Sequence, residues 1–138
     1  MSVQLLRDLR TTPCGVLLFG RSRTKNILST RLKDKYGASY DKAKDDYRGC
    51  YELFPLKEQA VGMLDLVDSV EVDESSDKAD IVSALACALT MFDVHAKSTK
   101  YDVREVFLFT DGETYTDWDD LDTLKDHFAS RNVLLSVM

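Results

Sequence analysis

Apolar residues occur along this chain in two patterns, as short continuous runs and at helical spacing. Short apolar runs bounded by glycine or polar residues are typical of buried strands. We therefore predict strands in four runs, CGVLLFG, CYELFPL, REVFLFTDG and NVLLSVM, at residues 14–20, 50–56, 104–112 and 132–138. Pro55 places the second strand at or near a sheet edge, because proline cannot donate a hydrogen bond to a ladder.

Helical spacing of apolar residues is found in four other segments. The predicted helices cover residues 3–10, about three turns after Lys57, residues 79–97 and residues 116–132. The stretch after Lys57 has Leu64 and Val67 on its apolar face. Pro13 ends the first helix, and Asp77 is the expected N-cap of the third.

A polar segment, residues 21–48, separates the first two predicted strands and has few aliphatic residues, chiefly the pair Ile27 and Leu28. We predict that it is an insertion in the form of a long, partly disordered hairpin or loop. It holds nine Lys or Arg against four Asp, a net charge of +5, so the rest of the chain carries −11 within a total of −6. Such a basic segment can contact phosphate, although the overall acidity argues against strong nucleic-acid binding by the domain alone.

The composition is that of a globular protein, with 44% hydrophobic and 30% charged residues. No apolar run approaches the roughly 20 residues of a membrane span, and residues 1–10 lack the apolar region of a signal peptide. We therefore expect the chain to be intracellular or to begin within a longer protein. Its three cysteines match no metal-binding spacing, and we interpret them as small core residues in a reducing compartment.

Alternation of strands and helices predicts one α/β domain over residues 1–138 with a largely parallel sheet. In such sheets the functional edge is formed by the carboxyl ends of the strands. The third strand ends at this edge in Thr110, Asp111 and Gly112. Asp111 either starts a turn there or belongs to a binding surface.

A strand that ends in hydrophobic residues followed by Thr-Asp-Gly, then a helix and another strand, resembles the von Willebrand factor A domain. In that family the aspartate helps to hold a divalent cation, together with an Asp-x-Ser-x-Ser motif and a threonine from a separate loop. This chain has no Asp-x-Ser-x-Ser motif. We therefore expect no metal and no other cofactor, and we interpret Asp111 as a turn residue or as the vestige of a metal site.

The order of motifs along nearly the whole chain resembles the amino-terminal A-like domain of the larger subunit of the Ku heterodimer. The motifs are GVLLFGRSRTKNIL, CYELFPL leading into AVGMLDLVDSV, DKADIVSALACALTMF, REVFLFTDGE and DLDTLKDHFASRNVLLSVM. This resemblance implies a von Willebrand A-like (Rossmann-like) three-layer domain with a mainly parallel sheet. The family's central first strand should precede residues 3–10 and is missing here. We therefore expect a fragment, a truncated gene product or a domain completed by a partner.

Ku proteins form a ring on broken DNA ends and support non-homologous end joining and telomere maintenance. The resemblance implies a nuclear, non-catalytic protein-interaction domain. Its partners would be a smaller Ku-like subunit and end-joining repair proteins, with double-stranded DNA ends bound only by the full heterodimer and no membrane contact. The alternative is a stand-alone A-like adaptor in another intracellular complex, of the transcription, repair or proteasome type.

An enzyme is disfavoured because no nucleophile has a plausible base, although Asp111, Glu113 and the acids of TDWDDLD cluster in sequence. Within the full assembly, the candidates for DNA contact are Arg21, Arg23 and Lys25, with ordinary surface charge as the alternative. The candidates for partner binding are Trp118, Glu113 and Tyr115. Tryptophan is enriched at interface hot spots, but core packing under the adjacent helix is the alternative for Trp118.

Overall fold

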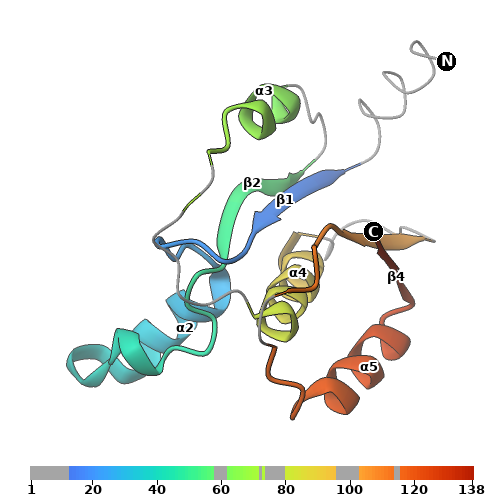
Figure 1. Cartoon of the computed structure of the whole chain (residues 1–138). Helices are drawn as coiled ribbons and strands as arrows, with labels where there is room; N and C mark the ends of the chain where they lie inside the picture. The colour runs from blue at the N-terminus through green and yellow to red at the C-terminus, as the bar shows by residue number, and fades with distance from the viewer. Residues whose placement is uncertain (1–12, 58–61, 72, 74–79, 96–102, 114–115) are drawn as a thin grey trace, which may run out of the picture.

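The computed structural model describes residues 13–57, 62–71, 73, 80–95, 103–113 and 116–138. It is a mixed α/β fold (Figure 1). The elements are β1 (Cys14–Leu18), α2 (Ile27–Tyr36), β2 (Tyr51–Lys57), α3 (Met63–Asp68), α4 (Ile81–His95), β3 (Arg104–Leu108), α5 (Leu121–Ser130) and β4 (Val133–Val137). The predicted helix at residues 3–10 and the expected cap Asp77 lie outside the described residues.

All four predicted strands are present, but they do not form one mainly parallel sheet. In the described part of the chain β1 pairs with β2 antiparallel, and β3 pairs with β4 parallel, as two separate two-stranded sheets. The expectation of a single mainly parallel sheet was therefore wrong for these residues. The segment between β1 and β2 returns the chain so that Leu18 faces Tyr51, which reverses the direction of β2. The edge position predicted for the strand with Pro55 is confirmed among the described strands, because β1 is the one strand that pairs with β2 there, apart from an isolated bridge between Lys25 and Tyr51.

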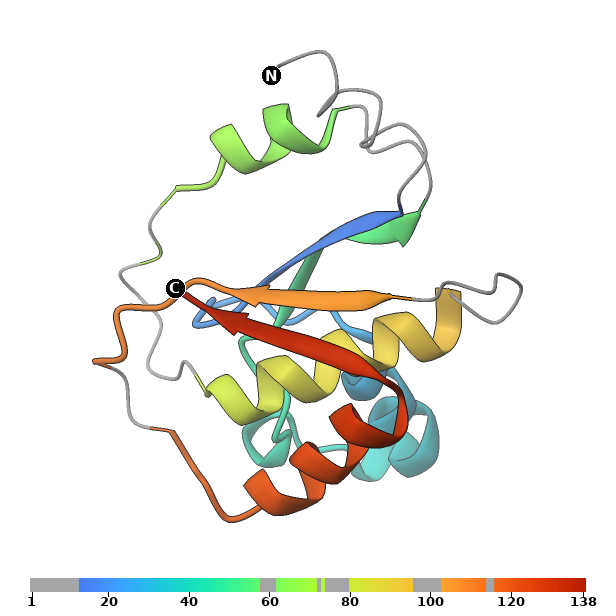
Figure 2. The same cartoon turned by 90° about the vertical axis from the view of Figure 1, so that its right-hand side faces the viewer.

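Helix α4 is the centre of the core. Figures 1 and 2 show both strand pairs between α3 on one side and α2, α4 and α5 on the other. The apolar side chains of α4 pack with those of the β3–α5–β4 unit, in a cluster formed by Ile81, Val82, Leu85, Leu89, Leu108, Leu124, Phe128 and Val133. A second buried cluster joins Cys50 at the start of β2 to Ala84 and Cys87 on α4. Both strand pairs therefore pack against the same helix, α4.

The cysteine interpretation is confirmed for Cys50 and Cys87, which are 2% and 3% exposed, whereas Cys14 is half-buried. A hydrogen bond with Cys50 and burial both raise the pKa of the Cys87 thiol above its usual range. Thiols in this state are poor nucleophiles at neutral pH. Cys50 and Cys87 are therefore packing residues.

The polar insertion at residues 21–48 was predicted as a loop, and this was wrong. It contains α2 and two short 3-10 helices, η1 (Gly37–Ser39) and η2 (Lys42–Lys44). The buried Asn26 caps α2 by accepting a hydrogen bond from the backbone nitrogen of Ser29 at 2.7 Å. Buried polar side chains hold this segment to the rest of the domain, together with Leu28 and Tyr47, which pack against the cluster of Cys50, Ala84 and Cys87.

The other helices begin later than the spacing predicted. Helix α3 covers only Met63–Asp68, and its side chains Leu64 and Val67 are exposed and do not pack on a core. Helix α4 begins at Ile81, where Asp80 accepts hydrogen bonds from the backbone nitrogen and hydroxyl of Ser83. Helix α5 begins at Leu121. The exposed α3 lies beside the β1–β2 pair, and this places it at the groove described next.

Candidate functional site

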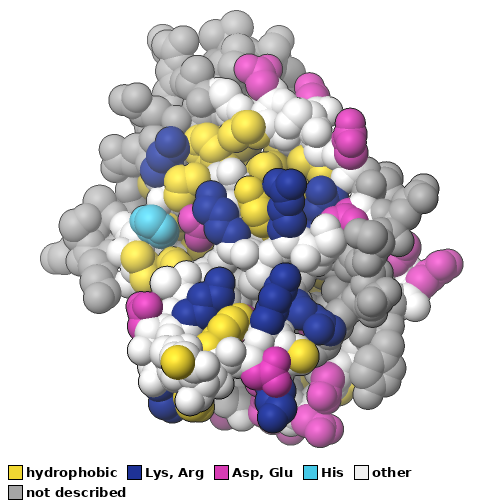
Figure 3. Space-filling model, turned by 90° about the vertical axis from the view of Figure 1, so that its left-hand side faces the viewer, with side chains coloured by type: hydrophobic (Ala, Val, Ile, Leu, Met, Phe, Trp, Pro, Cys, Tyr) yellow, Lys and Arg dark blue, Asp and Glu magenta, His cyan; other side chains and the backbone are white. Residues whose placement is uncertain are grey.

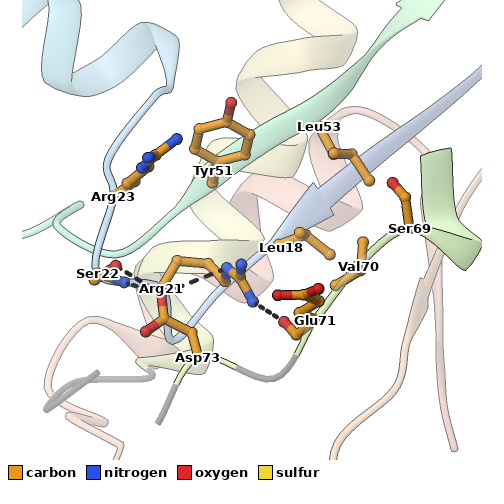
Figure 4. Close-up of a pocket in the computed structure, with 10 residues that line it drawn as sticks. All are labelled: Leu18, Arg21, Ser22, Arg23, Tyr51, Leu53, Ser69, Val70, Glu71 and Asp73. Atoms are coloured by element: carbon orange, nitrogen blue, oxygen red, sulfur yellow. Dashed lines mark hydrogen bonds and ion pairs between the residues drawn. The ribbon is translucent and has the colours of Figure 1, made fainter. Parts of the chain in front are cut away.

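A groove of about 650 Å³ lies between the β1–β2 pair and the end of α3 (Figure 4). Its residues come from three places in the chain: the end of β1 with the turn after it, the start of β2, and the segment after α3. They are Leu18, Arg21, Ser22, Arg23, Tyr51, Leu53, Ser69, Val70, Glu71 and Asp73. Two of the three predicted DNA-contact residues, Arg21 and Arg23, thus line one concave surface.

Arg21 joins the two walls of this groove. Its Nη1 donates a 2.6 Å hydrogen bond to the carbonyl oxygen of Glu71, and its Nε lies 3.8 Å from Oδ2 of Asp73. The same carboxylate oxygen accepts hydrogen bonds from the backbone nitrogen and hydroxyl of Ser22, at 2.8 and 2.7 Å. These contacts fasten the turn after β1 to a segment about fifty residues later. The guanidinium of Arg21 is therefore engaged within the protein.

Arg23 and Lys25 are exposed and, in the described part of the chain, form no ion pair. The Nζ of Lys25 lies 5.6 Å from the centre of the Tyr51 ring, a cation–π contact. Lys25 is fixed in place because its backbone nitrogen donates to Cys50 and its carbonyl accepts from Glu52. Of the three candidate cations, Lys25 thus lies against Tyr51, and Arg23 and Lys25 are exposed to a ligand.

The cations of this region extend beyond the groove. In Figure 3, Lys and Arg side chains gather across the centre and lower half of the face, with hydrophobic side chains between and above them. Among the described residues of 21–48, only Arg21 and Lys44 lie within 4.0 Å of a carboxylate. Several of the lysines lie instead against tyrosine rings, with Lys33 over Tyr40 and Lys35 over Tyr36. Among the described residues, most cations of this face therefore have no ion-pair partner, in a protein of net charge −6.

The Asp111 turn is held by local hydrogen bonds. The Asp111 Oδ1 accepts a hydrogen bond from the backbone nitrogen of Glu113 at 3.1 Å, and the hydroxyl of Thr110 accepts one from Gly112 at 3.1 Å. Gly112 has a φ of 71°, which suits glycine in such a turn. The backbone of Thr110 also donates to Met138, next to the end of β4. Asp111 thus has the turn role that the sequence left open.

The partner-binding candidates belong to the connection between β3 and α5. Trp118 is 56% exposed, so the alternative of core packing was wrong for it. Its carbonyl accepts a hydrogen bond from the backbone nitrogen of Leu121 at the start of α5. Glu113 is exposed, and Tyr115 lies outside the described residues. A binding role for these three residues stays a prediction.

Sequence reasoning missed Tyr51, Leu53 and Val70, the apolar part of the groove. A signal was present for the first two, because the predicted strand at 50–56 has apolar residues at successive positions and therefore on both faces. Phe54 is buried at 5% exposure, whereas Tyr51 and Leu53 are only half-buried. A second apolar face on a strand is stabilised when other residues pack over it, and α3 packs over only part of this face.

In the part of the chain that the structure describes, no group of three or more His, Cys, Asp or Glu side chains is arranged to hold a metal ion. No described helix is long and apolar enough to span a membrane. Comparison with models of known protein families finds no match, and comparison with curated proteins finds none either. The function must therefore be inferred from the fold and its surfaces.

Proposed function

We propose that this chain is a non-catalytic protein-interaction domain of the von Willebrand A-like type, from a Ku-like protein that acts at DNA double-strand breaks. In this proposal it works in the nucleus, in non-homologous end joining and telomere maintenance. It would pair with a smaller Ku-like subunit and recruit end-joining proteins. DNA ends would be bound only by the complete heterodimer, and no cofactor takes part.

The observation that carries the proposal is the division of the strands into two pairs on one helix. An A-type sheet without its central first strand leaves two half-sheets. In the described residues, β1–β2 and β3–β4 are separate pairs that both pack on α4. This arrangement supports the resemblance carried by the order of motifs along the sequence.

Two features of the surface support an interaction role over catalysis. The Oδ1 of Asp111 accepts a hydrogen bond from the backbone nitrogen of Glu113 within its own turn, which supports a structural role for this carboxylate. The concave surface of the described residues lies elsewhere, beside Tyr51, and combines apolar side chains with exposed cations. Such a combination is suited to holding a partner.

The proposal is tested by tagging the protein at its own locus, purifying it and identifying its partners by mass spectrometry. Co-purification of a second Ku-like subunit and end-joining proteins is the expected result. Recovery without any Ku-like subunit would overturn the Ku assignment. It would favour the alternative, a stand-alone A-like adaptor in another intracellular complex. The same features of the fold support that alternative.

A further inference from the structure

The groove beside Tyr51 is held in shape by contacts within the protein. Its two walls are joined by the hydrogen bond from Arg21 to Glu71 and by the carboxylate of Asp73, which accepts from Ser22. The side chain of Asp73 is only 13% exposed, so these contacts are partly shielded from water. Hydrogen bonds to a shielded carboxylate are stronger than those at an open surface. The groove thus has a defined shape before any ligand arrives.

The floor of the groove is apolar. Leu18, Leu53 and Val70 line it, and Figure 4 shows them beside the Tyr51 ring, on the side of the groove away from Ser22. Val70 is 36% exposed although it belongs to an apolar surface. A ligand side chain that covered these residues would remove apolar area from water, which is favourable. The floor therefore fits one apolar or aromatic side chain of a ligand.

The rim of the groove on the side of β2 and α2 is positively charged. Arg23 and Lys25 stand there without a carboxylate partner in the described residues, and the cations of α2 continue the same face. Exposed charges on one face attract a ligand of opposite sign and set its orientation. The rim therefore requires anionic groups next to the apolar anchor.

We propose that this groove binds an acidic peptide segment of a partner protein, with one apolar side chain over Leu18, Leu53 and Val70 and carboxylates at Arg23 and Lys25. This inference rests on the proposed interaction function and names the chemistry of the partner. A nucleic-acid backbone fits the groove less well, because a phosphodiester chain has no apolar group to cover Leu18, Leu53 and Val70.

The test is a fluorescence anisotropy titration of the purified full chain with short fluorescein-labelled peptides. The first peptide has one central phenylalanine flanked by aspartate and glutamate. The second has lysine at every acidic position, and the third keeps the acids but has alanine in place of phenylalanine. Fluorescent double-stranded DNA of similar charge is titrated in parallel. We expect saturable binding of the first peptide alone.

The decisive variant is the double charge reversal Arg23→Glu with Lys25→Glu. It should weaken binding of the acidic peptide by about tenfold, because two attractive rim charges become repulsive. The matched control is Lys42→Glu with Lys44→Glu, which makes the same charge change on the same basic segment at residues that neither line the groove nor lie against Tyr51. The control should change the affinity by less than about threefold, since long-range charge is screened by salt. Circular dichroism and the melting temperature verify that both variants fold.

Equal weakening by both double variants would show general charge attraction and overturn the groove assignment. Tighter binding of DNA than of the acidic peptide would overturn the choice of partner. Absence of binding to every peptide would overturn the inference as a whole. None of these results concerns the Ku-like subunit, whose co-purification tests the proposed function separately.

Discussion

The side-chain amide of Asn26 donates a 3.0 Å hydrogen bond to the carbonyl oxygen of Cys50, across the polar insertion. The same nitrogen donates to the carbonyl of Tyr47 at 3.1 Å, and the amide oxygen accepts from the backbone nitrogen of Ser29. Asn26 is 6% exposed. One side chain thus begins α2 and ties it to the start of β2, next to the groove.

Replacing Asn26 should destabilise the domain. Asn26→Ala removes the helix cap and two buried hydrogen bonds, and we expect a loss of about 2 kcal/mol in the free energy of unfolding, measured by urea titration. Asn26→Asp keeps an acceptor for Ser29 but places a buried charge against two carbonyls. Its loss should be larger at neutral pH and should shrink as the pH falls, because the protonated acid can donate.

The control is Asp41→Ala, which removes a similar contact at an exposed site, where Asp41 accepts from the backbone nitrogen of Ala43 at 2.9 Å. It should change stability much less than either Asn26 variant. An Asn26→Ala protein as stable as the Asp41→Ala protein would contradict the role assigned to Asn26.

Short apolar runs were sufficient to predict the four strands, and helical spacing was sufficient to predict α4 and α5. In these two helices the side chains that pack, such as Leu85 and Phe128, recur with the period of the backbone. Helix α2 was missed because only Ser29 is buried within it. Its first turn is held by the polar contacts of Asn26, which have no periodic signature in the sequence.

The pairing of the strands and the groove depend on contacts between distant residues. The sequence does not show that Arg21 reaches Glu71, or that Leu18 faces Tyr51. The three candidate cations could be chosen from the charge pattern alone. That Arg21 is engaged while Arg23 and Lys25 are available could be learned only from the structure.

Asp45 should also stabilise the polar insertion at residues 21–48. It is 3% exposed and accepts hydrogen bonds from the hydroxyl of Tyr40 at 2.7 Å and the backbone nitrogen of Tyr47 at 2.9 Å. Asp45→Ala leaves both donors without this partner, and we expect a loss of about 2 to 3 kcal/mol. Chemical denaturation measures it. Asp46→Ala, at the exposed neighbouring position, should have little effect, and an equal loss in both would contradict the prediction.

The same hydrogen bond predicts a loss of stability in alkali. Burial and the contact with Asp45 raise the pKa of Tyr40 from 10.0 to about 12. A pKa raised in the folded state gives stability that is present below the ordinary value and is lost as the pH rises toward 12. The urea midpoint of Tyr40→Phe should therefore fall less steeply than that of the wild type as the pH rises from 10.0 to about 12. Tyr36→Phe, at an exposed ring, serves as the control and should decline like the wild type.

Gly15 is required where β1 crosses α4. A Cβ added at Gly15 would lie 2.9 Å from Cε of Met91 and 3.0 Å from the backbone of Leu56 on β2. The methionine can move, but the strand backbone cannot without disturbing the β1–β2 ladder. Gly15→Ala should therefore destabilise the domain by about 1 to 3 kcal/mol, measured as a lower urea midpoint. Unchanged stability would show that β1 and β2 are farther apart than described.

Asp93 and Arg131 form a paired contact between the ends of α4 and α5. The Nε and Nη2 of Arg131 donate to the two carboxylate oxygens of Asp93, each at 2.9 Å. The hydrogen bonds from Arg131 hold the pKa of Asp93 below its ordinary value of 3.8. A carboxyl pKa lowered by folding gives stability that is present above the ordinary value and is lost as the pH falls through the folded one.

Asp93→Asn should therefore lower stability at neutral pH and converge with the wild type in acid. We expect a loss of about 0.5 kcal/mol, because the Asp93 side chain is 43% exposed and its charge is screened by water. The control is Asp122→Asn, which breaks the exposed pair between Asp122 and Lys125 and should leave the urea midpoint unchanged. Urea midpoints compared at neutral pH and near pH 3 measure both. If the stability difference between Asp93→Asn and the wild type persisted in acid, Asp93 would stabilise the protein through its shape and not through its charge.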